Sequence, residues 1–189
     1  LKALLNRLPS SLQVEKDINS TFELNYDTIG FIPQNPFTSL SMMTKIKDQF
    51  FCSNEKKEEV LKLVDLDISL LNKFPSQLSG GQIQRIVIAI ALSRNIKLLL
   101  LDEPTTALDE ENKTNIINLI NDLKSRLNIL ILFVTHDIES IKDICNEIII
   151  LKDGQVIEKG FTIDVLSTPK EDYTKKLINS TFKNKQFRN

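Results

Sequence analysis

Two segments of the chain are almost continuously apolar, and neither alternates with polar residues. They are residues 96–101 and residues 129–134. Such runs are typical of parallel strands that are covered on both faces. Residues 112–127 lie between them and are predicted to be a helix. The three segments then form a strand–helix–strand unit, whose crossover is expected to be right-handed.

The remaining pattern adds further strands and helices. Four leucines between residues 1 and 8 fall on one helical face, which predicts a helix that begins in mid-pattern and stops at Pro9. Asp153 and Gly154 have the sequence of a hairpin turn. The other expected elements are strands at residues 28–32, 147–151 and 156–159, and helices at residues 56–64, 81–93, 138–144, 163–166 and 171–181.

Composition narrows the class of protein. The chain has 189 residues, 41% of them hydrophobic, which suits one globular domain with an attached subdomain. Its net charge of −1 gives no basic field that would favour a nucleic-acid partner. The two cysteines lack metal-type spacing, and the apolar runs are far below the ~18 residues needed to span a bilayer.

Two adjacent acids, Asp102 and Glu103, end the first apolar strand. In parallel α/β sheets, ligands bind at the carboxyl ends of the strands. A carboxylate there can hold Mg²⁺ through water, and a second carboxylate can polarise an attacking water molecule. Two acids can also simply end a strand and cap a turn. A glycine-containing loop upstream favours the functional interpretation.

That loop is Leu-Ser-Gly-Gly-Gln at residues 78–82, where the helix predicted at residues 81–93 begins. Ser79 can cap this helix, and Gly80 and Gly81 let the backbone approach a ligand closely. A helix N-terminus offers free N–H groups and the positive end of its dipole to a phosphate. The alternative is an ordinary helix cap with no ligand.

Three further polar residues lie next to predicted elements. His136, the only histidine, follows the strand at residues 129–134, where it can bond a phosphate or orient water. Gln34 follows the strand at residues 28–32, and its amide oxygen can coordinate Mg²⁺. A solvated loop residue is the alternative for this glutamine. Asp109 can cap the helix that follows it.

In this order, the motifs resemble those of the ATP-binding-cassette ATPases, and the resemblance covers essentially the whole chain. Gln34 matches the Q-loop of that family, and His136 matches its switch histidine. Residues 78–82 match the signature loop, residues 98–103 the Walker B strand, and residues 107–109 the D-loop.

The resemblance implies an α/β fold, namely a P-loop NTPase-like core with a mostly parallel sheet and an inserted helical subdomain. Residues 1–35 and 96–160 are assigned to the ATP-binding core. Residues 36–95 are assigned to the helical subdomain with the signature loop, and residues 161–189 to a C-terminal helical tail.

The resemblance also implies a site for ATP and Mg²⁺ that two such domains enclose between them. Glu103 is then the general base and His136 the second catalytic residue, while Asp102 and Gln34 hold Mg²⁺, mostly through water. Ser79 and Gly81 contact the γ-phosphate of ATP bound by the partner. The residues expected to bind ATP are Gln34, Ser79, Gly80, Gly81, Gln82, Asp102 and Asp109.

A narrower likeness concerns the transported substrate. Residues 32–40 look like the Q-loop of the dipeptide, oligopeptide and nickel importers, and residues 169–177 are similar to their C-terminal segment, although the His-Pro common before Tyr173 is absent. An importer implies a second ATPase subunit, identical or paralogous, transmembrane permease subunits, and a substrate-binding protein reached indirectly. It implies no nucleic acid, and a peripheral place on the cytoplasmic face of the membrane. Residues 36–51 are the candidate docking surface for the permease.

One motif of the family is missing from the sequence. None of the five glycines begins the Gly-x-x-x-x-Gly-Lys-Ser/Thr loop that holds the phosphates of ATP. We therefore expect an N-terminally truncated piece of an ATPase, inactive alone. The alternative is a non-catalytic cassette that lends only its signature loop to a partner. A cassette ATPase of DNA repair or translation is disfavoured, because the chain has no coiled coil, zinc cysteines or second cassette.

Overall fold

The computed structural model describes residues 17–106 and 108–186, which fall into two compact units. The first unit is Leu1–Val134 and the second is Thr135–Asn189. This boundary lies inside residues 96–160, which the sequence assigns to one part of the ATP-binding core. The helix predicted at residues 1–8 lies outside the described residues.

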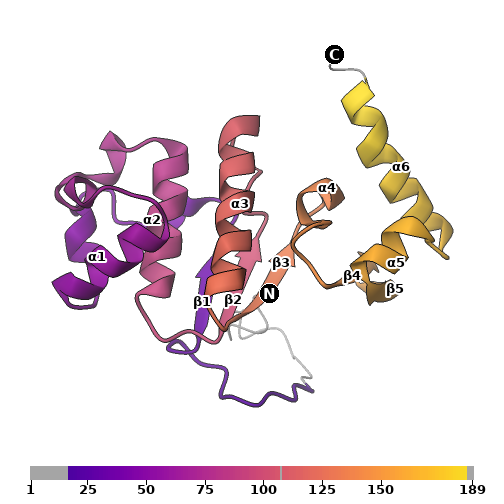
Figure 1. Ribbon diagram of the computed structural model, residues 1–189, viewed down its shortest axis with the longest axis horizontal. Coiled ribbons are helices and arrows are strands. Elements are labelled where there is room, and N and C mark those ends of the chain that lie inside the picture. Colours follow the sequence, from indigo (N-terminus) through magenta and orange to yellow (C-terminus); the bar gives the residue numbers. More distant parts are fainter. Residues whose placement is uncertain (1–16, 107, 187–189) are drawn as a thin grey trace. The chain divides into compact units, whose positions relative to one another are not determined.

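A parallel sheet of three strands organises the first unit (Figure 1). Its order is β1 (Ile29–Ile32), β2 (Leu98–Asp102) and β3 (Leu130–Val134). The central strand β2 buries Leu99, Leu100 and Leu101 completely. Its continuous apolar run therefore lies between two covered faces, as the sequence predicts.

The same prediction is wrong for β3 within the described residues. Leu130, Leu132 and Val134 are 62%, 39% and 39% exposed, while the two residues between them are half-buried. The reason is that β3 is an edge strand, which pairs only with β2 in the described sheet. Its alternate side chains point to a face that no described element covers.

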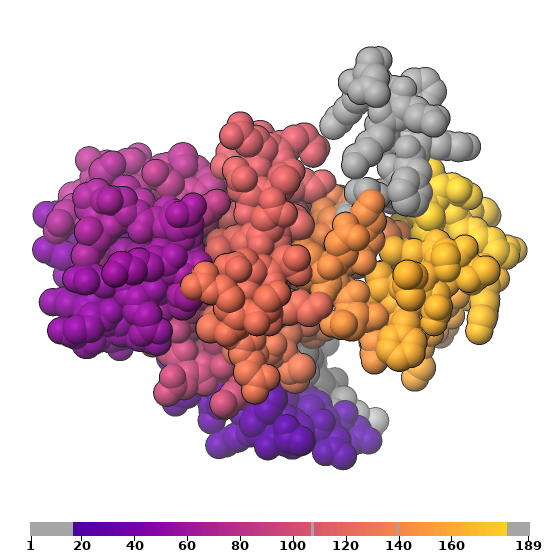
Figure 2. Space-filling model, viewed as in Figure 1, coloured from indigo at the N-terminus to yellow at the C-terminus, as the bar shows by residue number. Residues whose placement is uncertain are grey.

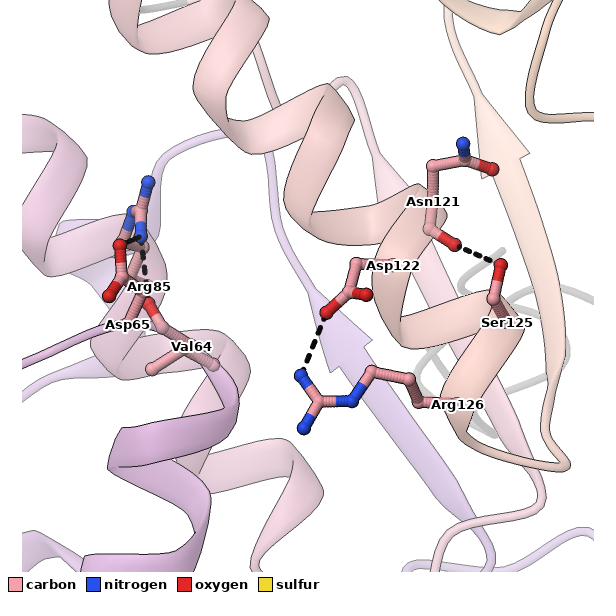
Figure 3. Close-up of polar contacts among 7 residues, drawn as sticks. All are labelled: Val64, Asp65, Arg85, Asn121, Asp122, Ser125 and Arg126. Atoms are coloured by element: carbon pink, nitrogen blue, oxygen red, sulfur yellow. Dashed lines mark hydrogen bonds and ion pairs between the residues drawn. The ribbon is translucent and has the colours of Figure 1, made fainter.

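Helix α3 (Glu110–Arg126) connects β2 to β3 and gives the predicted strand–helix–strand unit. It is drawn in front of β1 and β2 in Figure 1. Ile116, Ile120 and Leu123 are buried along one stripe of this helix. Its exposed side carries the ion pair between Asp122 and Arg126, whose Oδ2 and Nη1 atoms are 2.9 Å apart (Figure 3).

The segment between β1 and β2 is mostly helical, as expected. It contains α1 (Asn54–Leu63), α2 (Gly80–Leu92) and four short 3₁₀ turns. Arg85 of α2 donates to the Val64 carbonyl at 2.9 Å and lies 3.5 Å from an oxygen of Asp65, so it fastens α2 to the end of α1 (Figure 3). Figure 2 shows this purple segment as packed side chains without an opening on the face drawn.

Gly30 lies in β1 where neighbouring side chains leave no room for a larger residue. A Cβ atom at this position would lie 2.9 Å from Ile96 Cδ1 and 3.1 Å from both Ala91 Cβ and Leu99 Cδ1. We predict that Gly30→Val lowers the free energy of unfolding by about 1–3 kcal/mol, because the core has no room for the added atoms. Urea unfolding of the intact protein measures this loss. Gly30→Ala should show a smaller loss, and equal stability of the three proteins would contradict the packing argument.

The second unit joins a hairpin to helices. Strands β4 (Glu147–Lys152) and β5 (Gln155–Phe161) are antiparallel, and Asp153 and Gly154 turn between them with φ values of 50° and 79°. Both residues of a type I′ turn need positive φ, which explains the predicted turn. Helices α4 (Ile138–Ile141), α5 (Thr162–Ser167) and α6 (Asp172–Gln186) complete the unit.

The carboxylate of Glu158 connects β5 to the start of α6. It accepts hydrogen bonds from the backbone N–H groups of Lys170 at 2.9 Å and Glu171 at 3.3 Å. The first of these bonds is the main cause of the lowered pKa of Glu158. No helix among residues 17–106 and 108–186 combines the length and the apolar character needed to cross a bilayer.

Candidate functional site

Asp102 and Glu103 lie at the carboxyl end of the central strand, where the sequence places them. Asp102 is the last residue of β2 and stands opposite Val134 of β3. The Glu103 backbone turns into the left-handed region, with φ of 48°, and its N–H group donates to the Val134 carbonyl at 2.8 Å. A non-glycine residue in this region is unusual and is found mostly at turns and functional sites. The chain therefore turns at Glu103, while the backbone of this residue stays hydrogen-bonded to β3.

A hydroxyl group orients the Glu103 carboxylate. Thr106 donates from Oγ1 to Glu103 Oε2 at 2.8 Å, and its backbone N–H donates to the Glu103 carbonyl at 3.3 Å. The glutamate is half-buried. The motif search missed Thr106, although a threonine three residues after an acid at a turn is a recognisable hydrogen-bonding pattern.

Gln34 lies at the same edge of the sheet as Asp102. It comes two residues after the end of β1, and Ile32 of that strand stands opposite Leu101, next to Asp102. Its side chain is exposed. The topology thus brings an amide oxygen and a carboxylate to the ends of two neighbouring strands. Both are oxygen ligands of the kind that Mg²⁺ prefers.

The signature loop forms a reciprocal helix cap, which confirms the capping role predicted for Ser79. Ser79 Oγ accepts the backbone N–H of Gln82 at 3.2 Å, and Gln82 Oε1 accepts the backbone N–H of Ser79 at 3.0 Å. The Gln82 side chain is therefore engaged with its own helix cap. The N–H groups of Gly80 and Gly81 belong to the first turn of α2, where helical residues lack backbone partners, so they can meet an anion there.

Asp109 caps α3, as predicted, and a single neighbour holds both of its carboxylate oxygens. The backbone N–H of Asn112 donates to Oδ1 at 2.8 Å, and Asn112 Nδ2 donates to Oδ2 at 2.8 Å. The backbone bond and then the side-chain bond from Asn112 hold the pKa of Asp109 below its ordinary value. Asp109 is exposed and remains a carboxylate at neutral pH.

The start of α3 lies against the start of α2. A Cβ atom at Gly81 would come within 2.5 Å of Asn112 Oδ1, and one at Gly80 would lie 3.8 Å from Leu108 Cδ2. The structure thus brings Gly81 of the signature loop close to residues of the D-loop and its helix. The sequence search missed Asn112, since an asparagine in the first turn of a helix is common. Ala107 lies outside the described residues.

His136 belongs to the second unit and lies two residues after the end of β3. Its side chain is exposed. On its C-terminal side, the backbone N–H of Asp137 donates to Thr135 Oγ1 at 3.0 Å, which makes a tight turn of the chain after β3. The catalytic role of His136 stays a prediction.

The described residues suit a part of a site for ATP and Mg²⁺. Asp102 and Gln34 have oxygen atoms that can serve as ligands, and the start of α2 has N–H groups that can meet a phosphate. No group of three or more His, Cys, Asp or Glu side chains is arranged for a metal ion in the described ranges. A cation that keeps water and phosphate ligands needs few protein groups, so this donor set fits Mg²⁺ with a nucleotide better than a metal bound by protein alone.

Comparison with known proteins gives one consistent result. The ABC transporter family matches residues 3–106. The methionine import ATP-binding protein MetN of Streptococcus thermophilus is 38% identical over 161 residues, which cover 80% of this chain and 45% of that protein. MetN of Bacillus subtilis is 42% identical over 124 residues, covering 66% of this chain and 36% of that protein. The chain thus spans less than half the length of these relatives.

Solved structures agree with the sequence relatives. A dimeric, post-hydrolysis ATP-binding cassette, MJ0796 bound to ADP and Pi, matches with 33% identity and a TM-score of 0.61, covering 72% of this chain and 63% of that chain. CbiO1 from Clostridium perfringens, described as part of the ABC transporter complex cbiONQ, matches with 28% identity and a TM-score of 0.67, covering 75% of this chain and 60% of that chain. The family match covers more than half of the 189 residues, and the chain therefore belongs to the ABC transporter family.

Proposed function

We propose that this chain is part of the ATP-hydrolysing subunit of an importer. The observation that carries the proposal is the edge of the parallel sheet, where Asp102 ends β2 and Glu103 follows it in a left-handed backbone conformation. In this site Glu103 is the general base, and Asp102 with Gln34 holds Mg²⁺ through water. Mg²⁺, when bound, neutralises charge on the phosphates, and Glu103 accepts a proton from the attacking water. His136 is proposed as the second catalytic residue.

The proposed active unit is a dimer of cassettes. The capped start of α2 offers its N–H groups and the Ser79 hydroxyl to the γ-phosphate of ATP that the partner cassette holds. Support comes from the fold, since the related cassette MJ0796 is described as dimeric and bound to ADP and Pi. The phosphate loop that the sequence lacks is proposed to belong to the intact protein. The partner cassette is then an identical or paralogous ATPase subunit.

A permease is the proposed partner of the helical segment. Apolar side chains of residues 36–51 divide into two groups: Leu40 and Phe50 are buried, while Met43 and Phe51 are 89% and 90% exposed. Phe37 and Met42, in the same segment, are also exposed. Exposed methionine and aromatic side chains in one segment suit a groove for a short helix. The subunit would thus sit on the cytoplasmic face of the membrane and reach a substrate-binding protein only through the permease.

Gln49 holds the loop that presents Met43. Its Oε1 atom accepts the backbone N–H of Ser41 at 2.8 Å, and its Nε2 atom donates to the carbonyls of Ser41 at 3.0 Å and Thr44 at 2.9 Å. A pre-formed loop loses less conformational entropy when a partner binds it. This bracing supports a docking role for the exposed side chains.

The transported substrate is proposed as a small amino acid or a related solute. The MetN relatives are described as methionine import proteins, which favours methionine. The likeness of residues 32–40 and 169–177 to peptide and nickel importers keeps short peptides and nickel chelates as the second candidates. Uptake of labelled methionine, dipeptide and nickel by cells that depend on the intact transporter distinguishes the three.

A matched pair of serine variants tests the proposed site. Ser53 caps α1 and Ser79 caps α2, each by accepting a backbone N–H three residues later. Either change to alanine should lower the free energy of unfolding by about 0.5–2 kcal/mol. Ser79→Ala alone should also slow ATP hydrolysis by the intact protein, by roughly 10- to 100-fold, because a hydrogen bond to a charged phosphate oxygen is lost.

Steady-state ATPase assays on the two variants and the unchanged protein supply the measurement. Equal activity of Ser53→Ala and Ser79→Ala would remove Ser79 from the nucleotide site. If the unchanged intact protein hydrolyses ATP only after addition of a different cassette, the non-catalytic alternative is favoured instead.

A further inference from the structure

Asn112 touches two loops that the proposed function uses separately. It is the third residue of α3, and its backbone and side-chain N–H groups donate hydrogen bonds to the two carboxylate oxygens of Asp109. The remaining polar atom of the same side chain, Oδ1, lies 2.5 Å from the position that a Cβ atom at Gly81 would take. Cγ of the same side chain is 3.2 Å from that position, so the oxygen side of the amide group faces Gly81.

The orientation of this amide is fixed from both sides. Nδ2 must point to the Asp109 carboxylate to donate its hydrogen bond, and this leaves Oδ1 on the Gly81 side. Gly81 is buried and has no side chain, so the amide fits against its backbone. Any displacement of Asp109 that carries the Asn112 amide with it must press on, or withdraw from, the start of α2.

We propose that Asn112 is a positioning residue that makes the signature loop and the D-loop aspartate move as one unit. The proposal rests on the proposed function, in which Ser79 and the start of α2 act on the nucleotide held by the partner cassette, and it adds that Asp109, which is expected to bind ATP, acts on the same nucleotide. Asn112 would then act in trans, on the partner's ATP, and not on the Glu103 of its own chain.

Asn112→Asp is the sharpest variant, because aspartate has the shape of asparagine but cannot donate to Asp109. It places a second negative charge beside the Asp109 carboxylate, while a negative charge in the first turn of α3 favours the helix. Asn115→Asp adds the same charge one turn later at an exposed position and is the matched control. We expect Asn112→Asp to slow ATP hydrolysis by the intact protein about tenfold, within the range typical of coupled sites. Asn115→Asp should leave the rate unchanged.

Mixed dimers test the direction of action. When Asn112→Asp protein is mixed with Glu103→Gln protein, one site of each mixed dimer combines an intact Glu103 with an intact Asn112 from the other chain. If Asn112 acts in trans, turnover of this mixture should clearly exceed the average of the two separate variants, because each mixed dimer keeps one unimpaired site. Turnover no faster than the average of the two separate variants would overturn the proposal.

Titration of the Asp109 carboxyl group by NMR separates this proposal from the proposed function. Asn112→Ala should raise the pKa of Asp109, because the side-chain hydrogen bond that stabilises its charged form is lost. An unchanged pKa would overturn the positioning role, whatever the ATPase result. A different result is that the pKa of Asp109 rises in Asn112→Ala but the Glu103→Gln variant still hydrolyses ATP. This result would show that the catalytic assignment of Glu103 has failed.

Discussion

Glu103→Gln should nearly abolish ATP hydrolysis by the intact protein while ATP binding persists. Glutamine keeps the size of glutamate and one hydrogen-bond acceptor for Thr106 Oγ1, but it cannot take a proton from water. General-base catalysis contributes about 10²- to 10⁴-fold to a rate, so the loss should fall in this range. Steady-state phosphate release and equilibrium binding of a fluorescent ATP analogue measure the two properties.

Glu58→Gln is the control for the charge change. Glu58 lies on α1 with an exposed side chain, away from the edge of the sheet that carries Asp102. The Glu58→Gln variant should hydrolyse ATP at the rate of the unchanged protein. If Glu103→Gln retains more than about a tenth of the rate, a loss well below what general-base catalysis supplies, Glu103 does not have the assigned role.

Met43→Glu should stop substrate uptake without stopping ATP hydrolysis by the isolated subunit. Met43 is 89% exposed, so the change costs the folded protein little. Against an apolar groove of a permease, the carboxylate would lose its hydration without gaining a partner, at a cost of several kcal/mol. Uptake by cells should therefore fall at least tenfold, while the purified intact subunit keeps its ATPase rate.

Met43→Leu is the matched control, since it keeps an apolar side chain of similar volume. It should support normal uptake. Normal uptake by Met43→Glu would show that this side chain does not contact the permease. Loss of ATPase activity in the same variant would show damage to the subunit itself.

The sequence predicts the strands well where their burial is complete. The apolar run of β2 and the strand at β1 lie in the sheet within two residues of their expected bounds. Helix α3 begins two residues earlier than expected, because Asp109 caps it and so sets its first turn. The apolar run of β3 gives no sign of the strand's edge position, since periodicity reports side-chain polarity and not the number of neighbouring strands.

The motifs also predict which loops come together, but not the side chains that hold them. Asp102 ends one strand and Gln34 follows the neighbouring strand, so topology alone places them at one edge. Thr106 and Asn112 are ordinary residues at turns and helix starts, and their roles depend on distances of 2.8 Å that only folded coordinates give. Sequence patterns therefore identify the candidate reacting groups more readily than the residues that hold those groups by hydrogen bonds.

The exposed outer side of β3 has a practical consequence for work with these residues alone. An edge strand with apolar side chains has unpaired backbone groups and an exposed apolar face. Such a strand can pair with strands from other chains. A recombinant piece limited to this sequence would therefore tend to associate through residues 130–134, with a turbidity that rises with protein concentration. The side chain of Leu132 is 39% exposed, and the charge introduced by Leu132→Lys would oppose such association.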